Sequence, residues 1–301
     1  MKNQTIGVLL GGLSAEREVS LNTGAGVLAA LQERSYDCAR IDWTEGTSLA
    51  RMIEDAGVDV VWNALHGTYG EDGAVQGLLT CMGIPGTGSG ILASALAFDK
   101  VASKRAFSVH DVPTPMWFLL DDGQGADEVT EFPCVIKPAS EGSSVGVTIV
   151  HDASEVANAI EKARACRGAT IVETYIPGME IHVGILGDEV IGEVEVRPSS
   201  EFYDYQAKYT RGDTRYIVPA PIDEAARESA HEVALRAYLA LGCSGHGRVD
   251  LRIDDSGEIY VLEVNTLPGM TKTSLLPKIA AHARMDYATL CERILAGARL
   301  G

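Results

Sequence analysis

Residues 247–265, GRVDLRIDDSGEIYVLEVN, hold two runs of alternating apolar and polar residues on either side of the turn-rich tetrapeptide DDSG. The pattern predicts a β-hairpin, because strand side chains point alternately to opposite faces and because Asp, Ser and Gly favour tight turns. Arg248 and Asp250 would share one face of the first strand, and Glu263 and Asn265 would point together on its partner. Folding at DDSG can therefore bring Asp250 beside Glu263.

Such a pair of carboxylates is a candidate metal site. Two carboxylates about 4 Å apart repel each other by roughly 4 kcal/mol at an effective dielectric of 20. A divalent cation removes this repulsion, and an all-oxygen ligand set suits magnesium better than zinc. The alternative is an ordinary solvated face, since Asp and Glu are mostly exposed. The next segment, NTLPGMTKTSL, favours the metal site, because its backbone donors at Gly269 and its hydroxyl groups could bind a carboxylate or a phosphate.

The remaining sequence predicts an α/β fold that becomes α+β in its C-terminal part. Apolar strands at 5–10, 38–43 and 58–65 alternate with helices that begin near Ser14 and at Leu49, which predicts a parallel sheet covered by helices. A single helix is expected from about 91 to 110. Later strands are expected at 116–120, 132–137, 147–150 and 171–176, with a hairpin over 180–196 that turns at Gly187-Asp188. Helices are expected at 224–241 and 287–298.

The composition excludes several classes of protein. The 301 residues carry a net charge of −17 and contain no basic run, which argues against binding to nucleic acid. No apolar stretch approaches the length of a membrane span and no targeting segment is visible, so a cytosolic protein is expected. The six cysteines lie far apart without a C-x-x-C pair, which predicts buried free thiols rather than a zinc site or a disulfide framework.

Two glycine-rich segments are candidate anion sites. Lys137 ends an apolar strand and leads into the loop PASEGSSVG, whose backbone N–H groups could bind phosphate, although the loop is not a P-loop and could be a plain connector. The turn Gly11-Gly12 precedes a helix, which is a typical anion site. Glu16 adds negative charge there, so an ammonium group is also plausible. His66 ends a predicted parallel strand, where α/β active sites lie, but a structural role is the alternative.

Two further segments are candidates for ligand recognition. Glu173 and Tyr175 share a face of a predicted strand and Glu180 follows the next turn, so this strand edge could bind an adenine base or be a plain strand and turn. Residues 199–216, SSEFYDYQAKYTRGDTRY, form a long loop that is rich in tyrosine. A loop of this length inside a compact domain is usually a functional lid or disordered, and the tyrosines favour a lid.

Together these segments resemble the D-alanine–D-alanine ligases of the ATP-grasp superfamily. The shared motifs run over nearly the whole chain, and in order they are GGLSAEREVS, ALHG, GEDG, the run from PGTGSG through FDK, IKPASEGSSVGV, FYDYQAKY, GRVD and LEVNTLPGMTKTSLLP. The resemblance implies an ATP-grasp fold with an N-terminal parallel-sheet domain. Its units would be an N-terminal substrate domain (1–92), a central ATP-grasp subdomain (93–182), and a C-terminal ATP-grasp subdomain (183–301) with the lid loop and the metal site.

The resemblance also implies an activity. The protein would join two D-alanines through a D-alanyl phosphate, releasing ADP and phosphate, in the synthesis of peptidoglycan precursors. It would need ATP and two Mg²⁺ ions, with Mn²⁺ as a substitute, and would be a cytoplasmic homodimer that binds neither nucleic acid nor membrane. Its rivals are a D-alanine–D-lactate ligase and a non-catalytic ATP-grasp regulator. The YDYQAKY pattern argues against the first, and the intact set of Arg248 and paired carboxylates argues against the second.

Residue roles follow from the resemblance by position. For ATP, the implied residues are Lys100, Lys137, Ser143 and Ser144 at the phosphates, Glu173, Tyr175 and Ile176 at the base, and Glu180 at the ribose. The implied metal ligands are Asp250, Glu263 and Asn265. For the first substrate, they are Glu16 at the ammonium group and His66 as a further binding residue. Arg248 and the Gly269 N–H would face the oxyanion, and Ser274 and Leu275 the second carboxylate. Lys208 and Tyr209 would lie on the lid, with Tyr209 linked to Ser143 and Glu16. One departure is Thr174, where relatives often have lysine, and another is the short segment 121–131.

Overall fold

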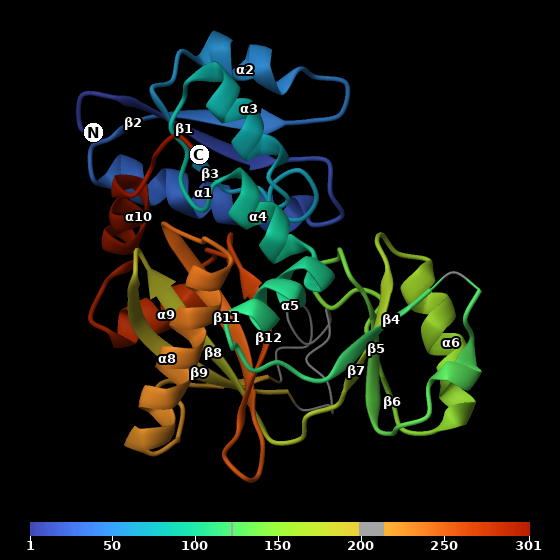
Figure 1. Cartoon of the computed structure of the whole chain (residues 1–301). Coiled ribbons are helices and arrows are strands. Elements are labelled where there is room, and N and C mark those ends of the chain that lie inside the picture. Colours follow the sequence, from blue (N-terminus) through green and yellow to red (C-terminus); the bar gives the residue numbers. More distant parts are fainter. Residues whose placement is uncertain (122, 199–213) are drawn as a thin grey trace.

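The computed structural model describes residues 1–121, 123–198 and 214–301. These residues form three separate sheets, each with its own helices (Figure 1). Both termini lie beside the first sheet (Figure 1). In the described part of the chain, no helix is long and apolar enough to cross a membrane.

The first sheet is parallel, as the alternation of strands and helices predicted. Its strands are β1 (Thr5–Gly11), β2 (Asp37–Trp43) and β3 (Val60–Asn63) in the order β2-β1-β3, with the helices α1 (Arg17–Glu33), α2 (Leu49–Ala56) and α3 (Ala74–Met82). The central strand β1 is covered on both faces. Ile6, Val8 and Leu10 pack into one hydrophobic cluster, and Leu9 packs into another on the opposite face. The helix expected near Ser14 begins at Arg17 instead. Ser14 Oγ accepts from the Glu16 N–H (3.2 Å) and donates to the His66 carbonyl (2.6 Å), so it fixes the loop before the helix.

The helix expected from about 91 to 110 is in fact two helices, α4 (Ile91–Phe98) and α5 (Lys100–Val109). Asp99 breaks the run: its backbone is extended and its side chain accepts from the Ala102 N–H (2.8 Å). Aspartate is a favoured residue at this position, because its carboxylate satisfies an N–H group that has no partner within the helix. The break makes Lys100 the first residue of α5.

The middle sheet is antiparallel, with the order β4-β7-β5-β6. Its strands are β4 (Trp117–Leu120), β5 (Cys134–Pro138), β6 (Thr148–Val150) and β7 (Thr170–Thr174). Helix α6 (Ala153–Arg164), which begins after Asp152, packs its apolar residues against this sheet. The short segment 121–131 contains a 3₁₀ turn, η1 (Ala126–Glu128).

The third sheet has the order β10-β9-β8-β11-β12 and contains both predicted hairpins. Its strands are β8 (Met179–Leu186), β9 (Glu189–Arg197), β10 (Arg215–Ile217), β11 (His246–Ile253) and β12 (Ile259–Asn265). Asp250 lies opposite Glu263, and Arg248 lies opposite Asn265, so the predicted pairing is confirmed. A register shift after Asp250 was not anticipated. Helix α8 (Glu224–Ala240) covers one face and α9 (Leu275–His282) the other, while α10 (Tyr287–Ala296) packs on α1.

All six cysteines are free thiols, as expected. Cys134, Cys243 and Cys291 are buried, but Cys81 is exposed, so the expectation of burial is wrong for that residue. Cys81 lies near the end of α3, a short helix between Gly73 and Gly83 that the sequence pattern did not predict.

Candidate active site

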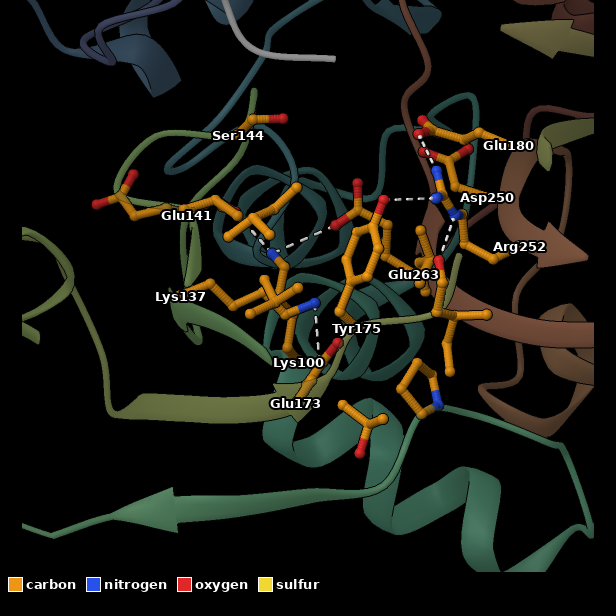
Figure 2. Close-up of a pocket in the computed structure, with 17 residues that line it drawn as sticks. Lys100, Lys137, Glu141, Ser144, Glu173, Tyr175, Glu180, Asp250, Arg252 and Glu263 are labelled. Carbon is orange, nitrogen blue, oxygen red and sulfur yellow. Dashed lines mark hydrogen bonds and ion pairs between the residues drawn. The ribbon is translucent and has the colours of Figure 1, made fainter. Parts of the chain in front are cut away.

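Two pockets adjoin at the third sheet, and Glu263 lines both of them. The first pocket lies between the middle and third sheets, and the predicted residues along it are Lys100, Lys137, Ser144, Glu173, Tyr175, Ile176, Glu180, Asp250 and Glu263 (Figure 2). The predicted residues along the second are Glu16, His66, Ser143, Arg248, Glu263, Asn265, Gly269, Ser274 and Leu275. Lys208 and Tyr209 lie outside the described residues. Every candidate that the structure describes therefore lines one of two adjoining pockets.

A buried carboxylate holds two lysines at the floor of the first pocket. Glu173 on β7 is 2% exposed, and its Oε1 lies 2.8 Å from Lys137 Nζ and 3.1 Å from Lys104 Nζ. Burial raises the pKa of Glu173, but the two lysines outweigh burial and hold it below its usual range. Burial lowers the pKa of Lys104 to about 8. Lys104 was not predicted, although it lies four residues after Lys100 on one helix and so shares its face.

Lys100 joins the glycine-rich loop to the hairpin. Its Nζ donates to the Glu141 carbonyl (2.7 Å) and lies 3.4 Å from Glu263 Oε2. The loop itself is held in unusual conformations, since Ser143 and Ser144 have φ angles of 51° and 61°. Non-glycine residues rarely adopt such angles, and they are concentrated at functional sites.

Asp250 is the most strongly held carboxylate of the hairpin. Arg248 donates to both of its oxygens, from Nε (2.6 Å) and Nη2 (2.8 Å), and Asn265 Nδ2 donates to Oδ2 (3.1 Å). His182 Nδ1 on β8 forms an ion pair with Oδ1 at 2.7 Å. Burial raises the pKa of Asp250, but the charges of Arg248 and His182 outweigh it and hold the pKa far below its usual range. Asp250 is therefore ionised at neutral pH.

The donor set fits an oxygen-preferring cation that is only partly coordinated by protein. Asp250 and Glu263 lie opposite each other on paired strands, and Asn265 adds an amide beside them. Among the described residues there is no group of three or more His, Cys, Asp or Glu that could hold a metal by itself. Magnesium commonly takes one or two carboxylates and completes its shell with substrate phosphates and water, so two carboxylates and an amide agree with this type of site.

Two charged residues that were not predicted connect Asp250 to the far end of the first pocket. His182 lies between Asp250 and Glu180, and Arg252 lies between Glu180 and the backbone of Ile176. Burial lowers the pKa of His182, but the charge and the hydrogen bonding of the two carboxylates outweigh it and raise the pKa above its usual value. The only sequence signal was spacing: His182 is two residues from Glu180, and Arg252 two from Asp250.

The second pocket begins at the N-terminus of α1. The Ser143 hydroxyl donates to the Glu16 carboxylate and so ties the glycine-rich loop to the first sheet. His66 is 6% exposed, with Nδ1 3.3 Å from Glu71 Oε1 and Nε2 3.2 Å from Thr23 Oγ1. Its ring is therefore fixed at the end of the parallel sheet.

The opposite side of this pocket is the N-terminus of α9. Ser274 precedes the helix and Leu275 is its first residue. Ser274 Oγ accepts from the Thr271 N–H (3.1 Å). A side chain at Gly269 would press on Ser274, because an ideal Cβ there would lie 2.9 Å from Ser274 Oγ.

The charges of the second pocket suit a small zwitterion. A carboxylate such as Glu16 can bind an ammonium group, whereas the Arg248 guanidinium and the N-terminus of α9 can bind a carboxylate or an oxyanion. Lysines and the glycine-rich loop in the neighbouring pocket suit phosphates. Because Glu263 lines both pockets, a phosphate in one and a carboxylate in the other would meet beside it.

Comparisons with known proteins agree with this geometry. A family model described as D-ala D-ala ligase C-terminus matches residues 121–296, and one described as D-ala D-ala ligase N-terminus matches residues 44–89. The D-alanine–D-alanine ligase of Syntrophotalea carbinolica is 47% identical over 301 residues, which cover 100% of this chain and 98% of the relative.

Two solved structures are also similar over nearly the full chain. The D-alanine–D-alanine ligase from Bacillus anthracis complexed with ATP has a TM-score of 0.85 at 38% identity, covering 97% of this chain and 96% of the other. The VanG D-Ala:D-Ser ligase from Enterococcus faecalis has a TM-score of 0.84 at 31% identity, covering 97% and 98%.

Proposed function

This chain belongs to the D-alanine–D-alanine ligase family and is an ATP-dependent ligase, and we propose that its two adjoining pockets hold ATP and two D-alanines. The observation that carries this assignment is the position of Glu263, which lines both the lysine-rich pocket and the pocket with complementary charges for a zwitterion. The reaction forms a D-alanyl phosphate and then D-alanyl-D-alanine, with ADP and phosphate as the other products.

In the first step the carboxylate of one D-alanine attacks the γ-phosphoryl group of ATP. Lys100 and Lys137 neutralise phosphate charge, and the loop at Ser143 and Ser144 closes over the phosphates. Positioning does most of the work in such transfers. This role for Lys137 is supported by its ion pair with Glu173, which holds the ammonium group in the pocket.

At the other end of this pocket, Tyr175 and Ile176 bind adenine through their backbone, and Glu180 binds the ribose. Glu173 was also assigned to adenine. Because its carboxylate is occupied by two lysines, we propose that its first task is to position Lys137.

Asp250, Glu263 and Asn265 hold magnesium in this proposal, with manganese as a substitute. When bound, the metal neutralises the charge that develops on the phosphate oxygens. The supporting observation is that Asp250 is held ionised opposite Glu263.

In the second step the amine of the second D-alanine attacks the acyl carbon. Glu16 holds the ammonium group of the first D-alanine, beside the fixed ring of His66. Arg248 and the Gly269 N–H stabilise the oxyanion, and losing one such donor typically costs about 3 kcal/mol. Ser274 and Leu275 receive the carboxylate of the second D-alanine, a role supported by their place at the N-terminus of α9.

Other assignments rest on the family alone. We propose that Lys208 and Tyr209 lie on a lid that excludes water from the acyl phosphate, and that Tyr209 adds to the contact between Ser143 and Glu16. We further propose the three units 1–92, 93–182 and 183–301, a cytoplasmic homodimer that binds neither nucleic acid nor membrane, and a part in peptidoglycan precursor synthesis, hence in cell wall biogenesis and cell shape.

The test is phosphate release from ATP and magnesium with D-alanine, L-alanine, D-alanine plus D-lactate, and D-alanine plus D-serine, with the mass of each product determined. D-alanyl-D-alanine formed in step with phosphate, and no release with L-alanine, is the expected result. A mixed product formed in preference to the dipeptide would move the assignment to a ligase with a different second substrate. No amino-acid-dependent phosphate would favour the non-catalytic regulator.

A further inference from the structure

Opposite charges alternate along one face of the third sheet, on strands β8 and β11. The side chains form a continuous series that we call the charge ladder: Arg248, Asp250, His182, Glu180 and Arg252. Arg248 donates to both oxygens of Asp250, and Asp250 Oδ1 lies 2.7 Å from His182 Nδ1. His182 Nε2 donates to Glu180 Oε1 (3.0 Å), and Arg252 Nη1 lies 3.4 Å from Glu180 Oε2. The ladder therefore runs from the second pocket to the ribose end of the first.

The outer end of the ladder is attached to the adenine edge. Arg252 Nε donates to the Ile176 carbonyl (3.0 Å), and Nη2 donates to the Tyr175 hydroxyl (3.3 Å). The guanidinium also lies 5.5 Å from the centre of the Tyr175 ring, within range of a cation–π contact. Figure 2 shows Arg252 between Tyr175 and Glu180, with dashed lines to both side chains.

His182 is the middle side chain of the charge ladder and is 2% exposed. It lies opposite Asp250 in the register of β8 and β11, and Arg252 lies opposite Glu180 two residues further along the pair. An imidazole is rigid, so its two nitrogens fix the separation of the carboxylates on either side. An apolar side chain would remove the donor that lies between the two carboxylates, so they would face each other with no group between them, which is costly in a buried site.

We infer that His182 is a positioning residue that links ribose recognition by Glu180 to the metal-binding carboxylate Asp250. This inference rests on the proposed function, which assigns Glu180 to the ribose and Asp250 to the metal. A ribose hydroxyl that binds Glu180 orders His182 and thereby Asp250. Because linked binding equilibria are reciprocal, a cation bound at Asp250 raises the affinity of Glu180 for the ribose hydroxyl.

The chain provides a matched control in His246. This histidine is also buried (1% exposed) and lies on β11, the strand paired with β8. Its ring packs near Trp62, and its Nδ1 has no hydrogen-bond partner among the described residues. Replacing it removes a buried imidazole without touching the ladder. A purely structural effect should therefore be shared by H182Q and H246Q.

The experiment measures by calorimetry the affinity for ADP, 2′-deoxy-ADP and 3′-deoxy-ADP, each with and without magnesium, for the wild type, H182Q and H246Q. In the wild type, removing the recognised hydroxyl should weaken binding about tenfold, the effect of one hydrogen bond to a charged group, and more with magnesium than without it. H182Q should lose most of this discrimination and its dependence on magnesium, whereas H246Q should keep both.

The inference would be overturned if H182Q still distinguished ADP from its deoxy analogues in a magnesium-dependent way. It would also be overturned if the wild type bound ADP, 2′-deoxy-ADP and 3′-deoxy-ADP equally well. If H182Q does not fold, R252M tests the same ladder from its outer end, because the His182–Asp250 contact remains. It should lose ribose discrimination, and unchanged discrimination would overturn the inference. Dipeptide formation by the wild type is measured separately, so failure of the ladder is distinguishable from failure of the ligase assignment.

Discussion

Replacing Glu173 by glutamine keeps the size of the side chain but removes the charge that two buried lysines share. Lys104 and Lys137 have side-chain exposures of 1% and 8%, and both lie within 3.1 Å of the same carboxylate oxygen. Removing one partner of a buried ion pair costs about 3–5 kcal/mol, because the remaining charge stays buried without compensation. We expect E173Q to lose about 3 kcal/mol of stability, at the lower limit because the amide oxygen still accepts a hydrogen bond.

Lys104 also makes the stability of the folded protein depend on pH. The pKa of Lys104 is about 8 in the folded wild type, against 10.5 for a free lysine, and Glu173 is what keeps it from falling further. The unfolded chain therefore binds this proton more tightly, and stability gains from Lys104 as the pH rises from about 8 to 10.5. Without Glu173 the folded pKa falls, so this gain should begin at lower pH and be larger.

The assay is urea unfolding followed by fluorescence at pH 7 and pH 9 for the wild type, E173Q, K104M and the double variant. K104M should restore part of the stability that E173Q loses, because one of the two unpaired charges is gone. E189Q is the control: its pair with Arg293 is exposed, at 70% and 45%, and should contribute less than about 1 kcal/mol. An E173Q protein as stable as the wild type at pH 7, or a double variant no more stable than E173Q, would show that Glu173 does not compensate the two buried lysines.

Three further predictions concern other parts of the chain. E263Q should reduce phosphate release to background, because Glu263 lines both pockets, and a near-normal rate at ordinary magnesium concentrations would contradict the metal assignment. Burial lowers the pKa of His246 to about 4, so stability should fall by roughly 3 kcal/mol as the pH drops from 6.5 to 4, and H246Q should abolish this dependence in urea unfolding. G178A should destabilise the protein by about 2 kcal/mol or more in the same assay, because its φ is 107° and a Cβ would lie 2.1 Å from the Ile253 carbonyl oxygen. G187A, with positive φ but nothing within 4 Å of its Cβ, should cost less, and equal losses would show that the contact is unimportant.

The hairpin of 247–265 was predictable because its information is local. Alternation sets which side chains share a face, and the DDSG turn sets which residues lie opposite each other, so Asp250 was correctly paired with Glu263. The register shift after Asp250 was not predictable, since an alternating pattern does not encode where one strand holds an extra residue.

The buried charges were harder to find because their partners lie on other strands. Lys104 is paired with Glu173, and His182 with Asp250, across segments that only the fold brings together. Nothing in the neighbouring residues distinguishes these side chains from solvated ones. The spacing of Lys104 from Lys100 showed that both side chains lie on one face of a helix, and the spacing of His182 from Glu180 showed the same for a strand. Neither spacing showed that Lys104 and His182 are buried.

Two short helices were missed for local reasons. Helix α3 lies between Gly73 and Gly83, and α9 follows a segment dense in turn residues and contains Pro277 near its start. Proline is tolerated in the first turn of a helix, where its missing N–H group has no partner in any case, so it did not mark the end of an element here.

In the proposed reaction, a carboxylate of D-alanine is activated as an acyl phosphate before the peptide bond forms. The most direct measurement gives the protein ATP, magnesium and D-alanine labelled with ¹⁸O in both carboxylate oxygens, and determines the masses of the phosphate and the dipeptide. We expect one ¹⁸O in each phosphate released and a dipeptide that has lost that one oxygen. Unlabelled phosphate released beside the dipeptide would contradict it, because the displaced carboxylate oxygen would then have left on another group, and so would phosphate release without any dipeptide.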